Sequence, residues 1–431
     1  MRFYLISPLL LLLFITLKGQ TTIDSVYKIE KIERSTRFAA TTFGLDLLSV
    51  AGGSMMINSQ NTNLPNNFIP RLTIGGIHFW GHADFYVSFP IGVNITNKPA
   101  NTNMYSLRES IESGAKFYPL AMKSGKIRPY IGVSFQPFIF RYASAGTNFR
   151  NGAPTFQRMN TPLHLGISYT TKNTIISFGT RYLNNPSFSY HILPTETTNV
   201  NLRAWSFNFS FLKYFDTSKS LATPNSVDQL NIKLYLLNKE NRLSSWYWGV
   251  GPSTALQISR SPYFRNNLPY INKDKVNTAI LPEVSVGRYF GSLDANLNLA
   301  FRTMSWSLKG FDTKINMSRS SFAMEPTKFL FDYHGFAPYI GPSIGIDKLS
   351  YNENNSKTSQ IKPAIGIVFG WDIRLSKTET SLLRTNLRYM PNHNLKVNGE
   401  KVMYDHLEFN FIQYIRYFGR AKFYKKYRKQ S

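Results

Sequence analysis

The two halves of this 431-residue chain repeat each other, and this constrains the fold more than any other feature of the sequence. Four pairs of segments correspond in the same order: IRPYIGVSFQPFIFRY (127–142) with FAPYIGPSIGIDKLSY (336–351), FNFSFLKYF (207–215) with FNFIQYIRYF (409–418), Phe-Trp-Gly-His-x-Asp (79–84) with Tyr-Phe-Gly-Ser-x-Asp (289–294), and Arg181-Tyr182 with Arg388-Tyr389. Four matches in one order at a nearly constant offset indicate a duplication. The sequence therefore predicts two copies of one structural unit.

Each half contains eight segments in which apolar and polar residues alternate between turn residues, a pattern typical of β-strands. They are 43–57, 69–80, 82–94, 105–119, 127–142, 161–171, 174–184 and 202–215, then 245–259, 280–290, 292–307, 320–333, 336–351, 360–375, 380–391 and 404–418. Long polar connections follow the odd-numbered segments and tight turns follow the even-numbered ones. A transmembrane β-barrel has this asymmetry, with long loops outside and short turns in the periplasm.

The N-terminus predicts export. A short positive start, Met1-Arg2, precedes an apolar run from Phe3 to Leu17, the layout of a Sec signal peptide over residues 1–20. No second apolar run is long enough for a spanning helix, so a membrane protein with this sequence must be a barrel. Residues 21–42 are then expected as a periplasmic N-terminal segment.

The strand pattern also predicts a polar barrel interior. In 292–307, Leu293, Leu297 and Phe301 share one face, while Asp294 and Arg302 share the other. A membrane barrel would hold the polar face inside, whereas a soluble barrel would turn it to solvent. We predict an interior polar network formed by Asp294, Arg302, Arg384, Arg388, His406 and Glu408.

Charge and composition restrict the partners. The net charge of +26 in an exported chain favours lipid phosphates and acidic polysaccharide over nucleic acid. The predicted outer loops 143–160 and 260–279 carry the candidate binding residues Arg150, Arg158, Arg265, Lys273 and Lys275. The basic tail 419–431 contributes to this charge, and the alternative for it is a disordered, solvated end. There are no cysteines and no phosphate-binding, zinc or calcium motif, so no metal or cofactor is expected.

Each half resembles the eight-stranded outer-membrane β-barrel families that include small OmpA-, OmpW- and PorT-like barrels. The resemblance depends on Pro129-Tyr130-Ile131-Gly132 and Pro338-Tyr339-Ile340-Gly341, and on the strand-final aromatic pairs Tyr214-Phe215 and Tyr417-Phe418. It implies an all-β transmembrane antiparallel barrel in the outer membrane, inserted by the barrel assembly machinery. The family's terminal aromatic closes the chain, whereas here Phe418 is followed by thirteen more residues.

The sixteen strands could close as two barrels or as one. We favour two eight-strand units, 43–215 and 245–418, joined by a periplasmic linker 216–244 in which LNIKLYLL (230–237) could form an extra strand. Two small barrels favour a structural or interaction role, with lipopolysaccharide, outer-membrane lipid or an envelope protein as partner. One wide barrel would favour a diffusion pore. A lipid-modifying enzyme is disfavoured, because none of the seven histidines is followed by Ser two residues on.

Overall fold

The computed structural model describes residues 34–50, 52–57, 59–64, 66–91, 104–109, 111–143, 154–221, 224–271, 278–333, 335–374 and 376–429. The expected signal peptide and most of the segment 21–42 lie outside these residues. From Arg34 onward that segment is not a separate periplasmic piece, because it begins the first strand of the fold. The fold is all-β, with antiparallel pairing throughout the described sheets.

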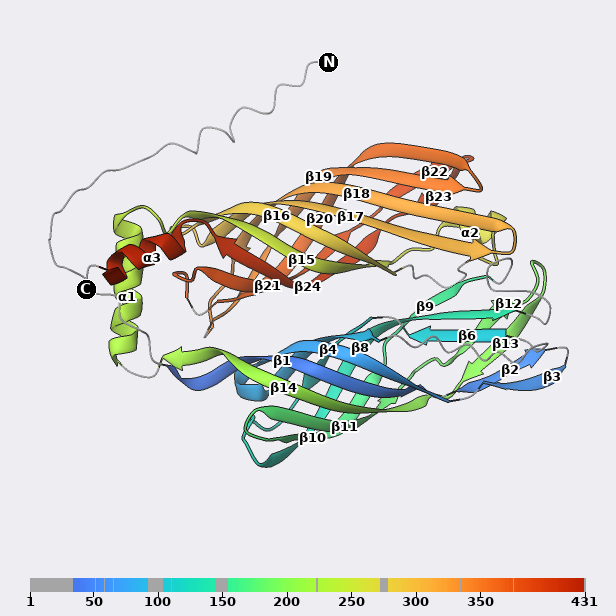
Figure 1. Ribbon diagram of the computed structural model, residues 1–431. Helices are drawn as coiled ribbons and strands as arrows, with labels where there is room; N and C mark the ends of the chain where they lie inside the picture. The colour runs from blue at the N-terminus through green and yellow to red at the C-terminus, as the bar shows by residue number, and fades with distance from the viewer. Residues whose placement is uncertain are drawn as a thin grey trace, which may run out of the picture.

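Eight strands of the first half pair in a ring (Figure 1). In order round the ring they are β1 (Arg34–Val50), β4 (Asn67–His78), β5 (Ala83–Pro90), β7 (Glu112–Phe117), β8 (Lys126–Ala143), β10 (Leu163–Thr170), β11 (Thr174–Tyr182) and β14 (Trp205–Leu221). The pairings of β8 with β10 and of β14 with β1 close it. The expected strand 43–57 is two strands, because β2 (Gly53–Ile57) leaves the ring to pair with β3 (Gln60–Leu64) and β13 (Thr197–Leu202).

The second half forms a closed barrel of its own. Its strands are β15 (Ser245–Gln257), β16 (Thr278–Phe290), β17 (Ala295–Gly310), β18 (Thr313–Phe329), β19 (Phe336–Glu353), β20 (Ser356–Ile373), β21 (Ser381–Met390) and β24 (His406–Tyr417). Over the described residues no strand of one ring pairs with a strand of the other. The chain therefore forms two eight-stranded barrels, and the single sixteen-stranded barrel is wrong.

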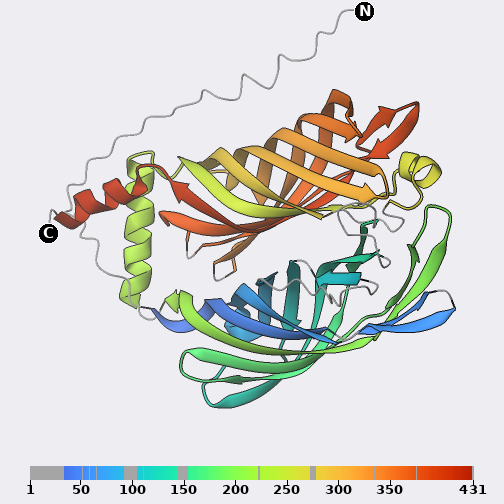
Figure 2. The same ribbon diagram turned by 45° about the vertical axis from the view of Figure 1, so that its right-hand side comes forward.

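The two barrels lie side by side with corresponding ends together (Figures 1 and 2). We call one end the helix end, because α1 (Pro224–Lys239) and α3 (Arg420–Lys429) lie there. The opposite end, the loop end, carries α2 (Pro262–Asn267), the hairpin β22 (Asn394–Val397) and β23 (Glu400–Met403), and a four-stranded sheet of β12 (Ser187–His191), β13, β2 and β3. Also at this end, β6 (Met104–Glu109) and β9 (Phe156–Asn160) pair with β8.

The segments 308–319 and 352–359, which the sequence placed between strands, are mostly continuations of the strands. β17 and β18 continue to a two-residue turn at Phe311-Asp312, and β19 and β20 to one at Asn354-Asn355, so long loops are absent from these two described connections. Positive φ at both asparagines, 43° and 80°, suits such a hairpin turn. The outward side chains near these turns are polar, which is why the sequence there resembles a loop.

Two segments outside the barrels form helices at the helix end. The segment 230–237, expected as a possible strand, lies in α1, whose Leu236 and Leu237 are buried in one cluster with residues of α3. The described part of the basic tail forms α3, Arg420–Lys429, and not a disordered end, because Phe423 and Tyr424 supply an apolar side that packs there. Gly419, with φ of 75°, turns the chain from β24 into this helix. No described helix combines the length and hydrophobicity that a membrane crossing needs.

Candidate functional site

Along β17 and β18, the inward and outward faces of the barrel wall exchange their polarity. From the helix end to Arg302, the inward positions of β17 include Asn298 and Arg302, and the outward ones are Leu297, Leu299 and Phe301. Beyond Arg302 the inward residues are Met304, Trp306 and Leu308, and the outward ones are Thr303, Ser305, Ser307 and Lys309. β18 changes at the same level, with Phe322 and Met324 outward below it and Asn316 and Ser318 outward above.

An apolar outside around a polar inside defines a transmembrane barrel wall, and the reverse is the organisation of a soluble protein. The helix-end part of each wall carries exposed outward residues that we call the apolar belt: Phe43, Leu45, Phe117, Ile131, Leu163, Leu165, Phe178, Phe207, Phe209 and Phe211 on the first barrel, and Trp248, Val286, Phe301, Phe322, Ile344, Ile346, Ile365 and Ile367 on the second. The second barrel is thus a transmembrane antiparallel β-barrel that extends past the membrane at its loop end.

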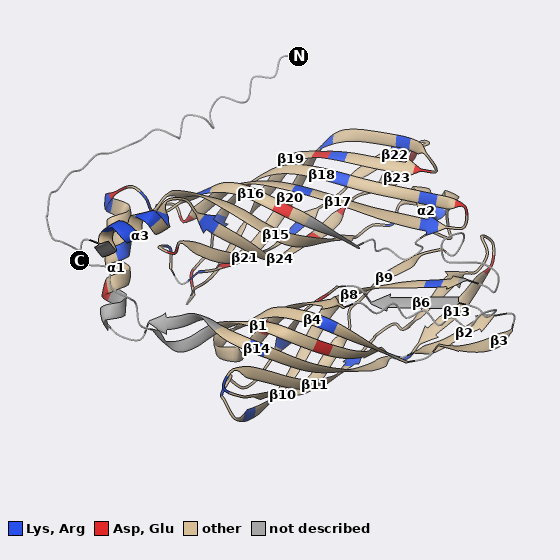
Figure 3. Ribbon diagram, viewed as in Figure 1, with Lys and Arg blue, Asp and Glu red and all other residues tan. Residues whose placement is uncertain are grey.

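Buried ion pairs fill the middle of the second barrel. Arg388 donates to both carboxylates beside it, with its Nη2 2.7 Å from Glu283 Oε1 and its Nε 2.5 Å from Glu325 Oε1. Arg302 lies 3.0 Å from Glu325 and 3.2 Å from Glu408, and Arg319 lies 2.5 Å from Glu408. These charges neutralise one another across the lumen, where an unpaired charge would be costly. Figure 3 shows acidic and basic residues along the strands of both barrels.

The structure brings together five of the six residues of the predicted interior network. Arg302, Arg388 and Glu408 belong to the central ion pairs, Arg384 pairs with Asp372 at 2.7 Å, and His406 is buried beside Trp306. Asp294 does not belong there. It lies in the turn before β17, at the helix end, and pairs with Arg374 and Lys377. The turn removes it from the inward row, which begins at Asn296.

Sequence reasoning missed Glu325, Arg319 and Asp347 in this network. Arg319 and Glu325 share the inward parity of β18, and Arg319 lies 2.5 Å from Asp347. The expected strand began at 320, so Arg319 fell into a predicted loop. Extending the two-residue alternation back to Thr313 would have found it.

The first barrel repeats the central pair on the same strands. Glu112 is on the fourth strand of its ring and Arg181 on the seventh, as are Glu325 and Arg388 in the second ring. Glu112 lies 3.8 Å from both Arg71 and Arg181. Ser134 Oγ and Glu112 Oε1 lie 2.8 and 3.4 Å from the same nitrogen of His164, Nε2. In a Ser-His-acid triad the acid instead contacts Nδ1, so these three residues do not have the geometry of a triad.

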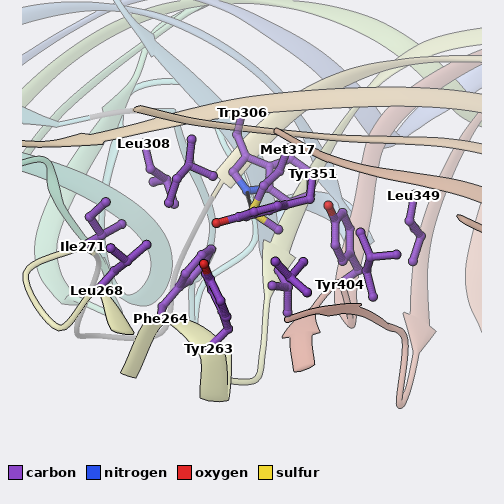
Figure 4. Close-up of a cluster of buried hydrophobic side chains, with 14 of the residues drawn as sticks. Tyr263, Phe264, Leu268, Ile271, Trp306, Leu308, Met317, Leu349, Tyr351 and Tyr404 are labelled. Atoms are coloured by element: carbon purple, nitrogen blue, oxygen red, sulfur yellow. Dashed lines mark hydrogen bonds between the residues drawn. The ribbon is translucent and has the colours of Figure 1, made fainter. Parts of the chain in front are cut away.

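Apolar layers close the second barrel above and below the ion pairs. At the loop end Tyr263, Phe264 and Leu268 come from α2 and the residue after it, and they pack on Trp306, Met317 and Tyr351 of the wall (Figure 4). Tyr263 and Tyr351 both donate to Glu353, and burial followed by this carboxylate raises the pKa of Tyr263 to about 12. The same cluster receives Leu395, Val397 and Val402 from the β22–β23 hairpin.

At the helix end, Tyr247, Tyr289 and Tyr417 are buried within one cluster with Phe329 and Tyr339. Arg420 from α3 lies 3.9 Å above the Tyr417 ring and donates to the carbonyl oxygens of Lys377, Glu379 and Leu243. The barrel therefore has an aromatic layer, a charged layer and a second aromatic layer in series. The interior of an eight-stranded barrel is narrow enough for side chains to fill it.

Two of the five predicted binding residues, Arg158 and Arg265, lie at the loop end on different elements. Arg158 on β9 donates to the carbonyl oxygens of Ser187 and Asn185, at 2.9 and 2.6 Å, and so attaches β9 to the strand β12. Arg265 on α2 is exposed. Arg150, Lys273 and Lys275 lie outside the described residues.

A different basic group occupies the outer wall of the second barrel. Lys309, Lys314, Lys348 and Lys357 are exposed on the outward faces of β17 to β20, on the loop-end side of the apolar belt. We call them the lysine row. The other outward positions of these strands above the belt carry Ser, Thr, Asn or Ile, and none carries Asp or Glu. Lys309 and Lys314 lie directly opposite each other in the β17–β18 register, an arrangement that costs stability without a counter-charge.

Comparison with known proteins finds similar solved structures but no matching family or curated protein. No protein-family model matches the chain, and no curated protein matches it. Among solved structures it is similar to Neisserial surface protein A, at 14% identity over 40% of this chain and 96% of that chain, with a TM-score of 0.29. The attachment invasion locus protein of Yersinia pestis matches at 10% identity over 40% of this chain and 97% of that chain, with a TM-score of 0.28. An outer membrane channel from Pseudomonas putida F1 matches at 8% identity over 93% of this chain and 100% of that chain, with a TM-score of 0.23.

Proposed function

We propose that the chain is a non-enzymatic outer-membrane protein whose sealed second barrel carries an interaction surface for anionic surface glycolipid. The observation that carries this proposal is the pairing of a filled lumen with an outward lysine row. A lumen blocked by ion pairs and two aromatic layers leaves the outside of the barrel and its loop end as the surfaces that can act.

The orientation follows from the asymmetry of the two ends. Long connections of outer-membrane barrels lie outside the cell and short turns lie in the periplasm. The loop end would therefore face outward, and α1 and α3 would lie in the periplasm. Export through the Sec pathway and insertion by the barrel assembly machinery belong to the same proposal.

The lysine row fits a lipid whose negative charges extend above the membrane. Lys348 is two residues beyond Ile346 of the apolar belt along β19, which is about 7 Å of strand. Lys309 lies eight residues beyond Phe301 on β17, or about 26 Å of strand, tilted relative to the membrane normal. Charges spread over this height suit the phosphates and acidic sugars of lipopolysaccharide better than a phospholipid headgroup. An acidic polysaccharide or an envelope protein would be a partner of the same surface.

Two measurements test the proposal. In a planar bilayer the refolded protein should show no sustained conductance, and a large stable step would contradict the sealed lumen. In a binding assay with purified lipopolysaccharide, replacing all four residues of the lysine row by Ser should weaken binding on the order of tenfold or more, with a strong dependence on salt.

The control variant replaces exposed lysines of α3, at Lys422, Lys425 and Lys426, by Ser. It removes a similar charge from the helix end and should leave lipopolysaccharide binding unchanged. Equal loss in both variants would mean that net charge alone governs binding, and the lysine row would then have no specific role.

A further inference from the structure

The two barrels contact each other near both ends. Near the helix end, the turn after β4 meets the turn before β19, with the Phe79 and Phe336 rings 5.2 Å apart and those of Trp80 and Tyr333 6.3 Å apart. At the loop end, the backbone N–H of Thr155 donates to the carbonyl oxygen of Lys309 at 2.8 Å. The barrels are therefore in contact on both sides of a common middle section.

A cavity of about 590 Å³ lies in this middle section, between the outward faces of the barrels. The first barrel contributes Val133, Phe135 and Ile139 of β8 and the outward residues of β7, and the second contributes Phe369, Leu387, Leu407 and Phe409. These are outward positions of the same kind as those that form the apolar belt elsewhere. The hollow exists because β7 places Ser113 and Ala115 at outward positions where most strands carry Leu, Ile or Phe.

The lining gains polar side chains toward the loop end. Toward the helix end it ends at Phe85 and Trp371, whose rings are 5.7 Å apart. Toward the loop end Gln157, Ser305 and Ser307 stand beside the apolar Ile139 and Met159, and the exposed Lys309 follows two residues later on the same face of β17. A polarity gradient of this kind matches an amphiphile with its chain toward the helix end.

We propose that the cavity between the barrels binds one anionic membrane lipid, with a hydrocarbon chain in the apolar part and the headgroup at Ser305, Ser307 and Lys309. The lining is continuous with the apolar belt, so in a membrane the cavity borders hydrocarbon and an acyl chain can enter it sideways. In the helix-end part of the cavity, water would have few polar groups to hydrogen-bond with. Each methylene of an acyl chain placed there is instead removed from water and stabilised by apolar contacts. This inference rests on the proposed membrane location.

The test is lipid retention by the full chain, measured by native mass spectrometry after release from nanodiscs of phosphatidylglycerol and phosphatidylcholine. The wild type should keep one lipid and prefer phosphatidylglycerol by about fivefold, the effect of one surface charge contact. Ser113→Phe places an aromatic ring in the part of the cavity that the small side chains of β7 leave open, and should abolish retention. The matched control, Ser49→Phe, makes the same change on β1, outside the lining, and should retain the lipid.

Each outcome has a distinct meaning. Loss in Ser113→Phe alone supports the site. Equal retention in both variants, or no bound lipid in the wild type, overturns it, and equal retention of the two phospholipids overturns the headgroup assignment. Lipopolysaccharide binding by Ser113→Phe should remain at the wild-type level, so a failure of this site is distinguishable from a failure of the lysine row.

Discussion

At the scale of single residues, Arg388 is the group on which the interior of the second barrel most depends. It is fully buried, and it donates to two carboxylates, Glu283 and Glu325, at distances of 2.5 to 3.0 Å. Arg388→Met should lower the free energy of unfolding by about 3–5 kcal/mol, because it leaves Glu283 without its arginine and Glu325 with Arg302 alone. Urea-induced unfolding in lipid vesicles measures the change.

A compensated variant shows whether the loss comes from uncompensated charge. Adding Glu283→Gln and Glu325→Gln to Arg388→Met removes both acids and should recover much of the lost stability. Arg416→Met, on the partly exposed outward side of β24, is the control and should change little. A loss below about 1 kcal/mol for Arg388→Met would contradict a tightly packed charged layer.

Asp294, at the helix end, should make the stability of the second barrel depend on pH. Burial alone would raise its pKa, but the hydrogen bond from Lys377 and the charge of Arg374 outweigh burial, so the pKa lies below the ordinary 3.8. A carboxylate with a depressed folded pKa contributes stability that is fully present above its unfolded value and is lost as pH falls through the folded one. Asp294→Asn should therefore be less stable than wild type at neutral pH, and the difference should shrink as the pH falls below the ordinary aspartate pKa of 3.8. A stability difference that is constant from neutral pH to acid would refute this contribution.

At the scale of elements, the exchange of polarity along β18 gives the sharpest test of membrane insertion. Met324 and Ser318 both point outward on this strand, on either side of the level at which the polarity changes, and Met324 lies deeper in the belt than Phe322 and is 39% exposed. In a membrane, Met324→Arg should cost about 2–4 kcal/mol, whereas Ser318→Arg beyond the belt should cost about 0–1 kcal/mol. Unfolding in vesicles measures both. In a soluble barrel the two arginines would be equally harmless, and that result would exclude the membrane assignment.

The strands and helices show where two-residue alternation in the sequence predicts structure correctly and where it fails. Two-residue alternation located all sixteen barrel strands, because inward and outward faces differ in polarity wherever the wall crosses the apolar belt. It failed beyond the belt, where outward polar residues such as Lys314 and Asn316 on β18 resemble a loop, although the inward Met317 belongs to the core. It failed again at α3, whose basic residues suggested a solvated tail while Arg420 and Phe423 enter the barrel mouth.

The candidate site was predictable only in part. The inward residues Arg302, Arg388 and Glu408 follow from strand parity, which is local. The lysine row depends on which positions lie above the belt, and the cavity depends on two barrels meeting. Ser113 and Ser305 are far apart in sequence and on different barrels, so no local pattern could have joined them.

At the scale of the whole molecule, the arrangement of the barrels decides whether the cavity exists. α1 connects the first barrel to the second, and its Leu236 and Leu237 are buried in the cluster at the second barrel's mouth. The C-terminal end of the linker helix is thus packed on the second barrel. The turns near Phe79 and Phe336 add a direct contact between the two barrels. Two barrels held at both ends should behave in the membrane as one body.

Because the natural chain has no cysteine, an engineered pair reports this arrangement without background. The backbone N–H of Thr155 donates to the carbonyl oxygen of Lys309 at 2.8 Å, so the two residues are neighbours across the contact between the barrels. Thr155→Cys with Lys309→Cys should therefore oxidise to an intramolecular disulfide in vesicles, seen as a reducible shift in gel mobility. Ser49→Cys with Lys309→Cys is the control, because β1 lies opposite β8 in the first ring. If only the first pair oxidises, the barrels keep their loop-end contact in the membrane, as the cavity between them requires; if neither does, that contact is lost in the membrane and the barrels do not behave as one body.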